Sequence, residues 1–156
     1  MPAIWTPLGS ASVDQEGECW FRKQFTLVRP ERGELQWHAS GQTSVYINGH
    51  PVRAAEGSDA GIFSAPVTRL LKPGVNLISV HVANGQVPHH LAMKLRIKEV
   101  NETSWRALVT DSSWMTHKAP GDGWHQLGHP DLSWARARSI RLASNADIGG
   151  ANSELP

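Results

Sequence analysis

The sequence predicts one all-β domain, an antiparallel β-sandwich with a jelly-roll path. Roughly ten short runs of alternating apolar and polar residues are separated by turn residues about every 8 to 12 positions. The pair Asn48-Gly49 interrupts one such run, and because both residues tolerate positive φ it predicts a tight type I′ hairpin. No useful stretch has the 3.6-residue period of a helix. The 156 residues suit a single domain, expected over 1–143, with a frayed tail at 144–156.

Alternation predicts the strands of the first half of the chain. In the longest run, Phe21, Phe25 and Leu27 share one face, and polar residues and Trp20 take the other. Pro30 and Gly33 bound a predicted turn. The predicted strands here are 3–5, 18–28, 34–40, 43–47 and 50–53, followed by a loop of small residues at 54–60.

The second half begins with one predicted helical turn at 66–71, which ends before Pro73-Gly74. The run 75–83 is the most strongly β segment, and 91–98 alternates between a buried and a solvated face. Shorter strands are predicted at 103–109, 114–117 and 134–142, with loops at 84–90 and 119–131.

The core is predicted from the apolar faces of these strands. It consists of Phe21, Phe25, Leu35, Trp37, Val45, Ile47, Ile78, Val80, Val82, Leu91, Met93, Leu95 and Ile97. Trp105 is also in phase with apolar neighbours and is expected in the core. The two Asp-x-Ser-Trp tetrads at 111–114 and 131–134 predict turn anchors, because Asp and Ser side chains bond nearby backbone amides.

Composition excludes several classes of function. The formal net charge is +1 and no run is rich in Lys and Arg, so nucleic acid is not an expected partner. No run of about 18 apolar residues is present, so no membrane span is predicted. Cys19 is the single cysteine, which excludes an internal disulfide and favours a small buried residue. The N-terminus has no signal-peptide pattern, although this says little if the sequence is a piece of a longer chain.

Catalytic and metal-binding patterns are also missing from the sequence. A glycosidase needs two carboxylates about 5 to 9.5 Å apart, whereas the 14 acidic residues here are scattered. No nucleophile elbow, zinc-protease motif or phosphate-binding loop occurs, so the chain alone is not expected to be an enzyme. No cofactor is expected. A structural calcium stays open, with Asp59, Asp122 and Asp131 as its candidate carboxylates.

Five phrases in order, spanning about 20–134, carry a family resemblance. The first reads Trp-Phe-Arg-Lys-Gln-Phe and the second Val-Tyr-Ile-Asn-Gly. In this order they resemble the galactose-binding-like β-sandwich attached to family 2 glycoside hydrolases and bacterial α-L-rhamnosidases. Pro66 departs from the pattern, which has an Asp at that position and so a polar cap. The phrases are 20–25, 45–49, 66–76, 110–114 and 131–134.

This resemblance implies a non-catalytic, carbohydrate-binding-like accessory domain of a larger secreted bacterial glycoside hydrolase. The implied partners are a carbohydrate and a fused or neighbouring catalytic domain, and the implied location is extracytoplasmic, periplasmic or secreted. The alternative is a structural or protein-interaction domain of the same fold without sugar affinity. An exposed Trp in a groove favours the first, whereas a flat polar surface or a large apolar patch favours the second.

Trp124 is the best candidate for a ring that stacks on sugar, because glycines flank Asp122 beside it and no strand pattern includes it. Core anchoring of this ring is the open alternative. The ligand site is expected where the loops 54–60, 84–90 and 119–131 meet. The other candidate ligand-binding residues, for which ordinary solvated loop positions are the alternative, are Asp122, His125, Arg53, Asp59, Asn84, His89 and His90.

Overall fold

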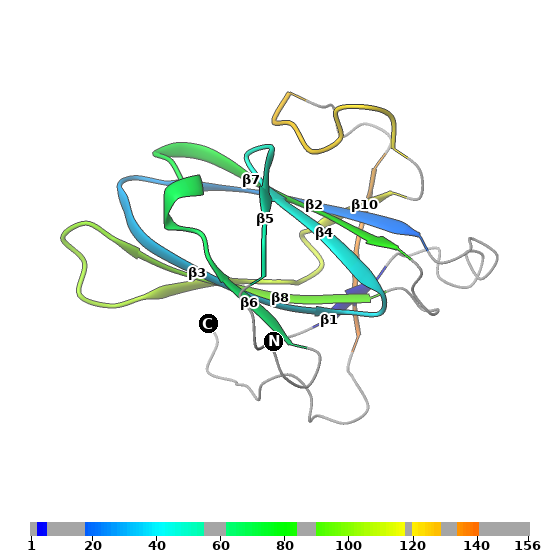
Figure 1. Ribbon diagram of the computed structural model, residues 1–156, viewed down its shortest axis with the longest axis horizontal. Helices are drawn as coiled ribbons and strands as arrows, with labels where there is room; N and C mark the ends of the chain where they lie inside the picture. The colour runs from blue at the N-terminus through cyan, green and yellow to red at the C-terminus, as the bar shows by residue number, and fades with distance from the viewer. Residues whose placement is uncertain are drawn as a thin grey trace.

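The computed structural model describes residues 3–5, 18–54, 62–83, 90–117, 120–128 and 134–140. Two antiparallel sheets face each other in these residues (Figure 1). The arrangement confirms the predicted antiparallel β-sandwich. The predicted tail at 144–156 lies outside the described residues.

Each sheet has six strands. Sheet A consists of β1 (Ala3–Trp5), β3 (Pro30–Ala39), β6 (Phe63–Pro66), β8 (His90–Glu99), β9 (Arg106–Val109) and β12 (Arg138–Ile140). Sheet B consists of β2 (Cys19–Leu27), β4 (Gln42–Ile47), β5 (His50–Val52), β7 (Gly74–Ala83), β10 (Met115–His117) and β11 (Ala135–Arg136). The order is β12-β1-β8-β3-β6 in sheet A, where β9 also pairs with β8, and β11-β10-β2-β7-β4-β5 in sheet B. Within the described segments, helix is confined to one 3-10 turn at Thr68–Leu70.

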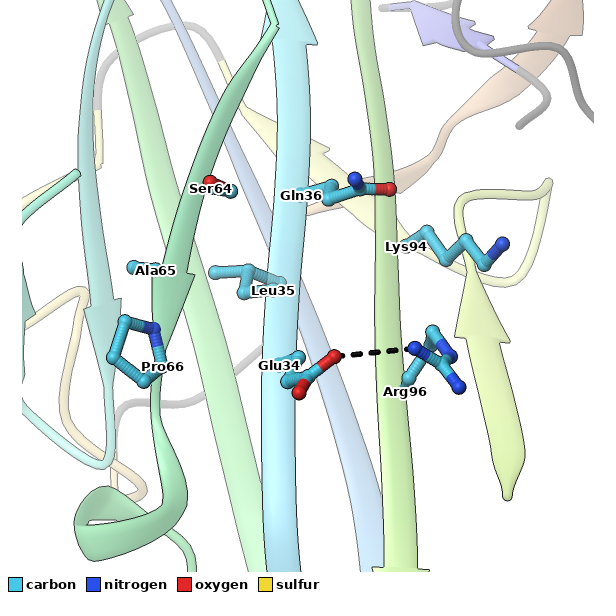
Figure 2. Close-up of a pocket in the computed structure, with 8 residues that line it drawn as sticks. All are labelled: Glu34, Leu35, Gln36, Ser64, Ala65, Pro66, Lys94 and Arg96. Atoms are coloured by element: carbon cyan, nitrogen blue, oxygen red, sulfur yellow. Dashed lines mark hydrogen bonds and ion pairs between the residues drawn. The ribbon is translucent and has the colours of Figure 1, made fainter. Parts of the chain in front are cut away.

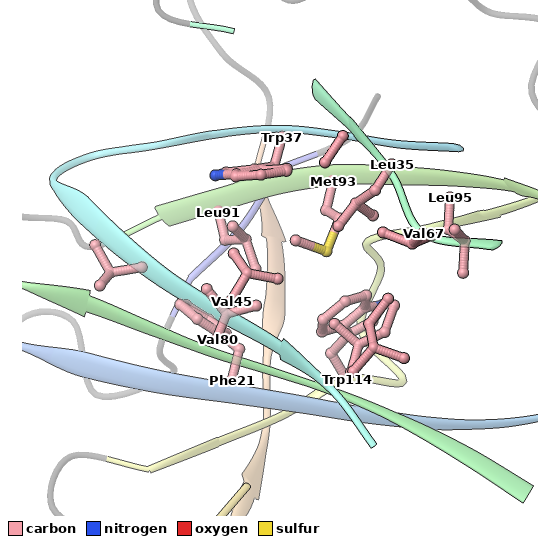
Figure 3. Close-up of a cluster of buried hydrophobic side chains, with 14 of the residues drawn as sticks. Phe21, Leu35, Trp37, Val45, Val67, Val80, Leu91, Met93, Leu95 and Trp114 are labelled. Carbon is pink, nitrogen blue, oxygen red and sulfur yellow. The ribbon is translucent and has the colours of Figure 1, made fainter. Parts of the chain in front are cut away.

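The core fills the space between the sheets (Figure 3). Every residue predicted for it is buried except Trp105, described below, and Phe25, which is half-buried and packs against the cluster. Trp114 and Val67 join this cluster. The first Asp-x-Ser-Trp tetrad is an anchor as predicted. Asp111 Oδ1 accepts a hydrogen bond from the Ser113 N–H at 2.8 Å, and Trp114 Nε1 donates to the Val109 carbonyl at 3.1 Å.

The predicted Asn-Gly hairpin joins β4 to β5. Asn48 and Gly49 have φ of 53° and 83°, the positive values that a type I′ turn requires. The Asn48 side chain also reaches sideways. Its amide donates to the Leu70 carbonyl and to Asn76 Oδ1, each at 2.9 Å, and its oxygen accepts from the Leu77 N–H at 2.9 Å. Asn76 in turn donates to the Lys72 carbonyl at 2.8 Å. The hairpin and the Pro-Gly turn before β7 are therefore held together by two asparagines.

The predicted turn at 30–33 is wrong, because β3 already begins at Pro30 and contains a bulge between Pro30 and Arg32. The turn lies earlier, at Val28 and Arg29, whose N–H groups both donate to Oε1 of the buried Glu99. The carboxylate of Glu99, 70 positions from Arg29 in the sequence, thus accepts the hydrogen bonds of the turn. Local propensity does not reveal such a distant partner.

Two other features of sheet A differ from the prediction. The short edge strand β6 was not predicted, because Ser64 and Ala65 have little β propensity and it forms by pairing with β3. Trp105 is half-buried and lies outside the core. Its ring contacts the guanidinium groups of Arg96 and Arg32, at 4.4 and 5.3 Å from the ring centroid. It precedes β9 on the polar outer face, so its apparent phase with apolar neighbours was misleading.

Candidate functional site

The outer face of sheet B carries aromatic side chains from three neighbouring strands. Trp20, His81 and Tyr46 take outward positions on β2, β7 and β4, because the alternate residues of each strand face the core. Trp20 and His81 are direct partners in the strand register, and their rings stack with centroids 4.4 Å apart and planes 8° apart. The alternation that builds the core therefore also builds an aromatic surface outside it.

The segment 120–128 lies over this surface and adds two further rings (Figure 1). The half-buried Trp124 ring lies 5.5 Å from Tyr46, 6.4 Å from His81 and 6.5 Å from Trp20, with interplanar angles of 71° to 90°. His125 lies 4.7 Å from Tyr46. Steep angles at these distances are the favourable edge-to-face geometry of aromatic pairs. These five rings, of Trp20, Tyr46, His81, Trp124 and His125, form what we call the aromatic cluster.

Polar contacts hold the segment 120–128 in place. Gly123 has a φ of 82°, and the Gln126 N–H donates to the Gly123 carbonyl at 2.9 Å, which closes a tight turn. The Gln126 carbonyl accepts from Arg22 Nη2 at 3.2 Å. The Gln126 side chain lies against Gly49, so close that an added Cβ on Gly49 would be 3.0 Å from Gln126 Oε1. The hairpin and β2 therefore set the position of Trp124.

Arg22 is buried although it points outward from sheet B, with 1 % of its surface exposed. Its guanidinium lies 5.3 Å from the centroid of the Trp134 ring, and it donates to Gln126 on the other side. A buried cation needs such partners. The second tetrad tryptophan and the segment 120–128 thus cover the outer face of sheet B around this residue.

The aromatic cluster also contains polar ring atoms. His81 Nε2 lies 3.6 Å from Glu18 Oε1. His125 Nδ1 is buried and has no hydrogen-bond partner within the described residues. Asp122 is exposed on the same turn as Trp124. Hydroxyl groups of a ligand here would therefore find an exposed carboxylate acceptor, Asp122, two positions from Trp124.

The structure separates the sequence-predicted site residues. Trp124 and His125 belong to the aromatic cluster, with Asp122 beside them, and Arg53 is exposed just after β5 at the edge of sheet B. His90 begins β8 in the opposite sheet, where its ring lies 5.6 Å from His38.

Asp59, Asn84 and His89 lie outside the described residues, so a meeting of the three loops stays a prediction. Sequence reasoning missed Trp20, Tyr46 and His81 as neighbours of Trp124. The sequence did carry one signal for them, because alternation places all three on the outward side of their strands.

The described residues contain no group of three or more His, Cys, Asp or Glu side chains that could hold a metal ion. Asp122 belongs to them, whereas Asp59 and Asp131 do not. Cys19 is buried, as predicted, and its Sγ lies 3.5 Å from Thr116 Oγ1. Burial raises the pKa of this thiol from 9.0 to about 12, against smaller opposing effects of hydrogen bonds from Thr116 and the backbone of Trp20. The thiol therefore stays protonated and is a packing residue.

In the part of the chain that the structure describes, no helix is long and apolar enough to cross a membrane.

Comparisons with known proteins identify the fold. No family model matches the chain, and no curated protein matches its sequence. Solved structures do match. An α-L-rhamnosidase of Aspergillus terreus gives a TM-score of 0.77 at 21 % identity, over 91 % of this chain and 21 % of that one.

Two further matches broaden this finding. An α-L-rhamnosidase of Streptomyces avermitilis, complexed with L-rhamnose, gives a TM-score of 0.72 at 22 % identity, over 88 % of this chain and 14 % of that one. A lectin of Pleurotus ostreatus in complex with GalNAc gives 0.71 at 20 % identity, over 90 % of this chain and 41 % of that one. The chain thus spans less than half the length of each protein. It has the fold of a β-sandwich domain that occurs in α-L-rhamnosidases and in a lectin.

Proposed function

We propose that this chain is a non-catalytic, carbohydrate-binding accessory domain of a larger glycoside hydrolase. The observation that carries the proposal is Trp124, a half-buried indole presented over sheet B with Asp122 and His125 beside it. The share of each matching rhamnosidase that the chain spans, 14 % and 21 %, supports an accessory role. An extracytoplasmic location belongs to the same proposal and rests on the resemblance alone.

Binding would use the indole as a platform for the apolar C–H face of a sugar ring. None of the described rings around Trp124 lies parallel to it, since the interplanar angles run from 59° to 90°. The exposed carboxylate of Asp122 would accept hydrogen bonds from hydroxyls. A single ring contributes on the order of 1 kcal/mol by analogy with aromatic pairs, so a single sugar should bind weakly.

The alternative is a structural or protein-interaction domain, and the packing of the same ring favours it. Trp124 contacts four other rings, and the segment that carries it covers the buried Arg22. A ring in such surroundings is well suited to anchor its own loop. The two functions differ in what loss of the indole does to stability and to sugar affinity.

The test is a glycan array followed by titration calorimetry on each hit, with Trp124→Ala and Trp105→Ala compared. Trp105 is the matched control, because it is also a half-buried tryptophan but lies on the opposite sheet. We expect Trp124→Ala to stay folded and to lose affinity, and Trp105→Ala to keep it. A folded Trp124→Ala protein with full affinity places the site elsewhere. An unfolded one, or an array without hits, supports the structural alternative.

A further inference from the structure

A polar groove lies on the outer face of sheet A, opposite the aromatic cluster (Figure 2). Its volume is about 530 Å³, within the range of small-molecule sites. Two cross-strand rows form it, in which β6 supplies short side chains and β3 and β8 supply long ones. One row is Ser64, Gln36 and Lys94, and the other is Pro66, Glu34 and Arg96.

One row is fixed by charge pairing. Arg96 Nη1 donates to Glu34 Oε1 at 3.1 Å, and Arg32 Nη2 lies 3.6 Å from the other carboxylate oxygen. The Arg96 guanidinium also lies 4.4 Å from the centroid of the Trp105 ring. Both oxygens of Glu34 and the guanidinium of Arg96 are therefore engaged. Two arginines thus share one carboxylate, which leaves a net charge of +1 around this row.

The other row has an uncompensated cation. Lys94 has no carboxylate partner within the described residues, whereas Lys98, four positions further along the same face, pairs with Glu31 at 2.9 Å. Figure 2 shows Gln36 extending from β3 over β8 and Lys94 extending from β8 away from β3, with Ser64 on the other side of β3. Of the described charged side chains that line the groove, Lys94 and Arg96 are positive and Glu34 is negative, which leaves a net charge of +1 among them.

We propose that this groove binds an anionic saccharide of the uronate class. One carboxylate of this saccharide pairs with Lys94, while Gln36 and Ser64 exchange hydrogen bonds with neighbouring hydroxyls. A carboxylate can accept charge-assisted hydrogen bonds from the Lys94 ammonium. An amide, a hydroxyl and an ammonium in one row suit a ligand that is polar on every side. The inference goes beyond the proposed function, since it concerns a second site on the other sheet.

The experiment is an NMR titration of the ¹⁵N-labelled protein with trigalacturonate, with its fully methyl-esterified form as the neutral probe. We expect saturable shifts in the backbone amides of 34–36, 64–65 and 94–96 with the acid only. Lys94→Gln should weaken binding about tenfold, the loss typical of one charge-assisted hydrogen bond. Lys98→Gln is the matched control, because it removes the same charge from the same strand outside the groove, and it should leave affinity unchanged.

Three results would overturn the inference: no saturable shift with trigalacturonate, equal losses in the two lysine variants, or equally tight binding of a tri-aspartate peptide. Equal losses indicate attraction by net charge alone, and peptide binding indicates a site for acidic protein segments. Trp124→Ala should leave these shifts unchanged. The experiments therefore distinguish failure of the proposed sugar site at the aromatic cluster from failure of the proposed site in the groove.

Discussion

Asn48 and Asn76 show how much one side chain does in this fold. Each amide bonds with both its oxygen and its nitrogen, and together they tie the β4–β5 hairpin to the start of β7. Asn76 is fully buried, so every polar atom that it satisfies would otherwise be a buried unpaired group. Asn48 stood out in the sequence as a turn residue. The bond between the two asparagines could not be predicted, because it joins positions 28 apart through side chains.

At the same scale, Cys19 predicts a pH effect on stability. Its thiol has a pKa of about 12 when folded, raised by burial, against 9.0 ordinarily. Above pH 9 the unfolded chain therefore loses this proton while the folded chain keeps it, so stability falls as pH rises from about 9 to 12. Raising the pH from 8 to 10 should destabilise the wild type by about 1.4 kcal/mol more than Cys19→Ala. Urea unfolding at both pH values measures this difference, and equal losses in the two proteins would contradict it.

At the scale of the elements, side chains from distant parts of the chain fix the tight turns. The Asn-Gly turn lies under Gln126 and so supports the segment that carries Trp124, and the Val28–Arg29 turn is held by Glu99, whose other oxygen pairs with Arg106. Alternation in the sequence predicted most strands correctly, because each has one face in the core. It failed for β6 and at the start of β3, where pairing with a neighbour outweighs local propensity.

A pair of glycines tests the link between the hairpin and the Trp124 segment. Gly49 and Gly74 both have strongly positive φ, 83° and 92°, so alanine strains either turn by about 1–2 kcal/mol. An added Cβ on Gly49 meets the Gln126 side chain, whereas one on Gly74 meets nothing within 4 Å. We expect similar losses of unfolding free energy. Only Gly49→Ala should shift the NMR signals of the Trp124 and His125 rings. Identical spectra there for both variants would mean that the hairpin does not position the segment.

On the scale of the whole domain, one core supports two outer faces of different character. Sheet B is covered in part by the aromatic cluster, whereas sheet A presents a polar groove lined by charged side chains of β3 and β8. The core itself was largely predictable, because period-two alternation exposes which side of each strand is buried. The two outer faces of the sandwich were harder to predict from the sequence. Trp124 was found from its glycine neighbours, but the rings that it contacts and the groove of sheet A depend on which strands become neighbours.

Substitutions in β7 test the core as a unit. Val80 is fully buried at the centre of the sandwich, whereas Val75 in the same strand is 45 % exposed. Val80→Asp places an unpaired charge in the core, which costs several kcal/mol, and should unfold the domain. Val75→Asp should keep the wild-type circular dichroism spectrum and nearly the same melting temperature. A cooperative transition at the wild-type temperature for Val80→Asp would show that this strand phase is wrong.

Two prolines have a further consequence for how the domain behaves beside other chains. β5 and β6 are terminal strands of their sheets, and each contains a proline, Pro51 in β5 and Pro66 at the end of β6. A proline offers no N–H to an incoming strand, so these short edges are poor templates for strand addition. Pro66 is also the position that departs from the family pattern, which has an Asp there. Its presence at this edge favours a domain that stays monomeric at high concentration.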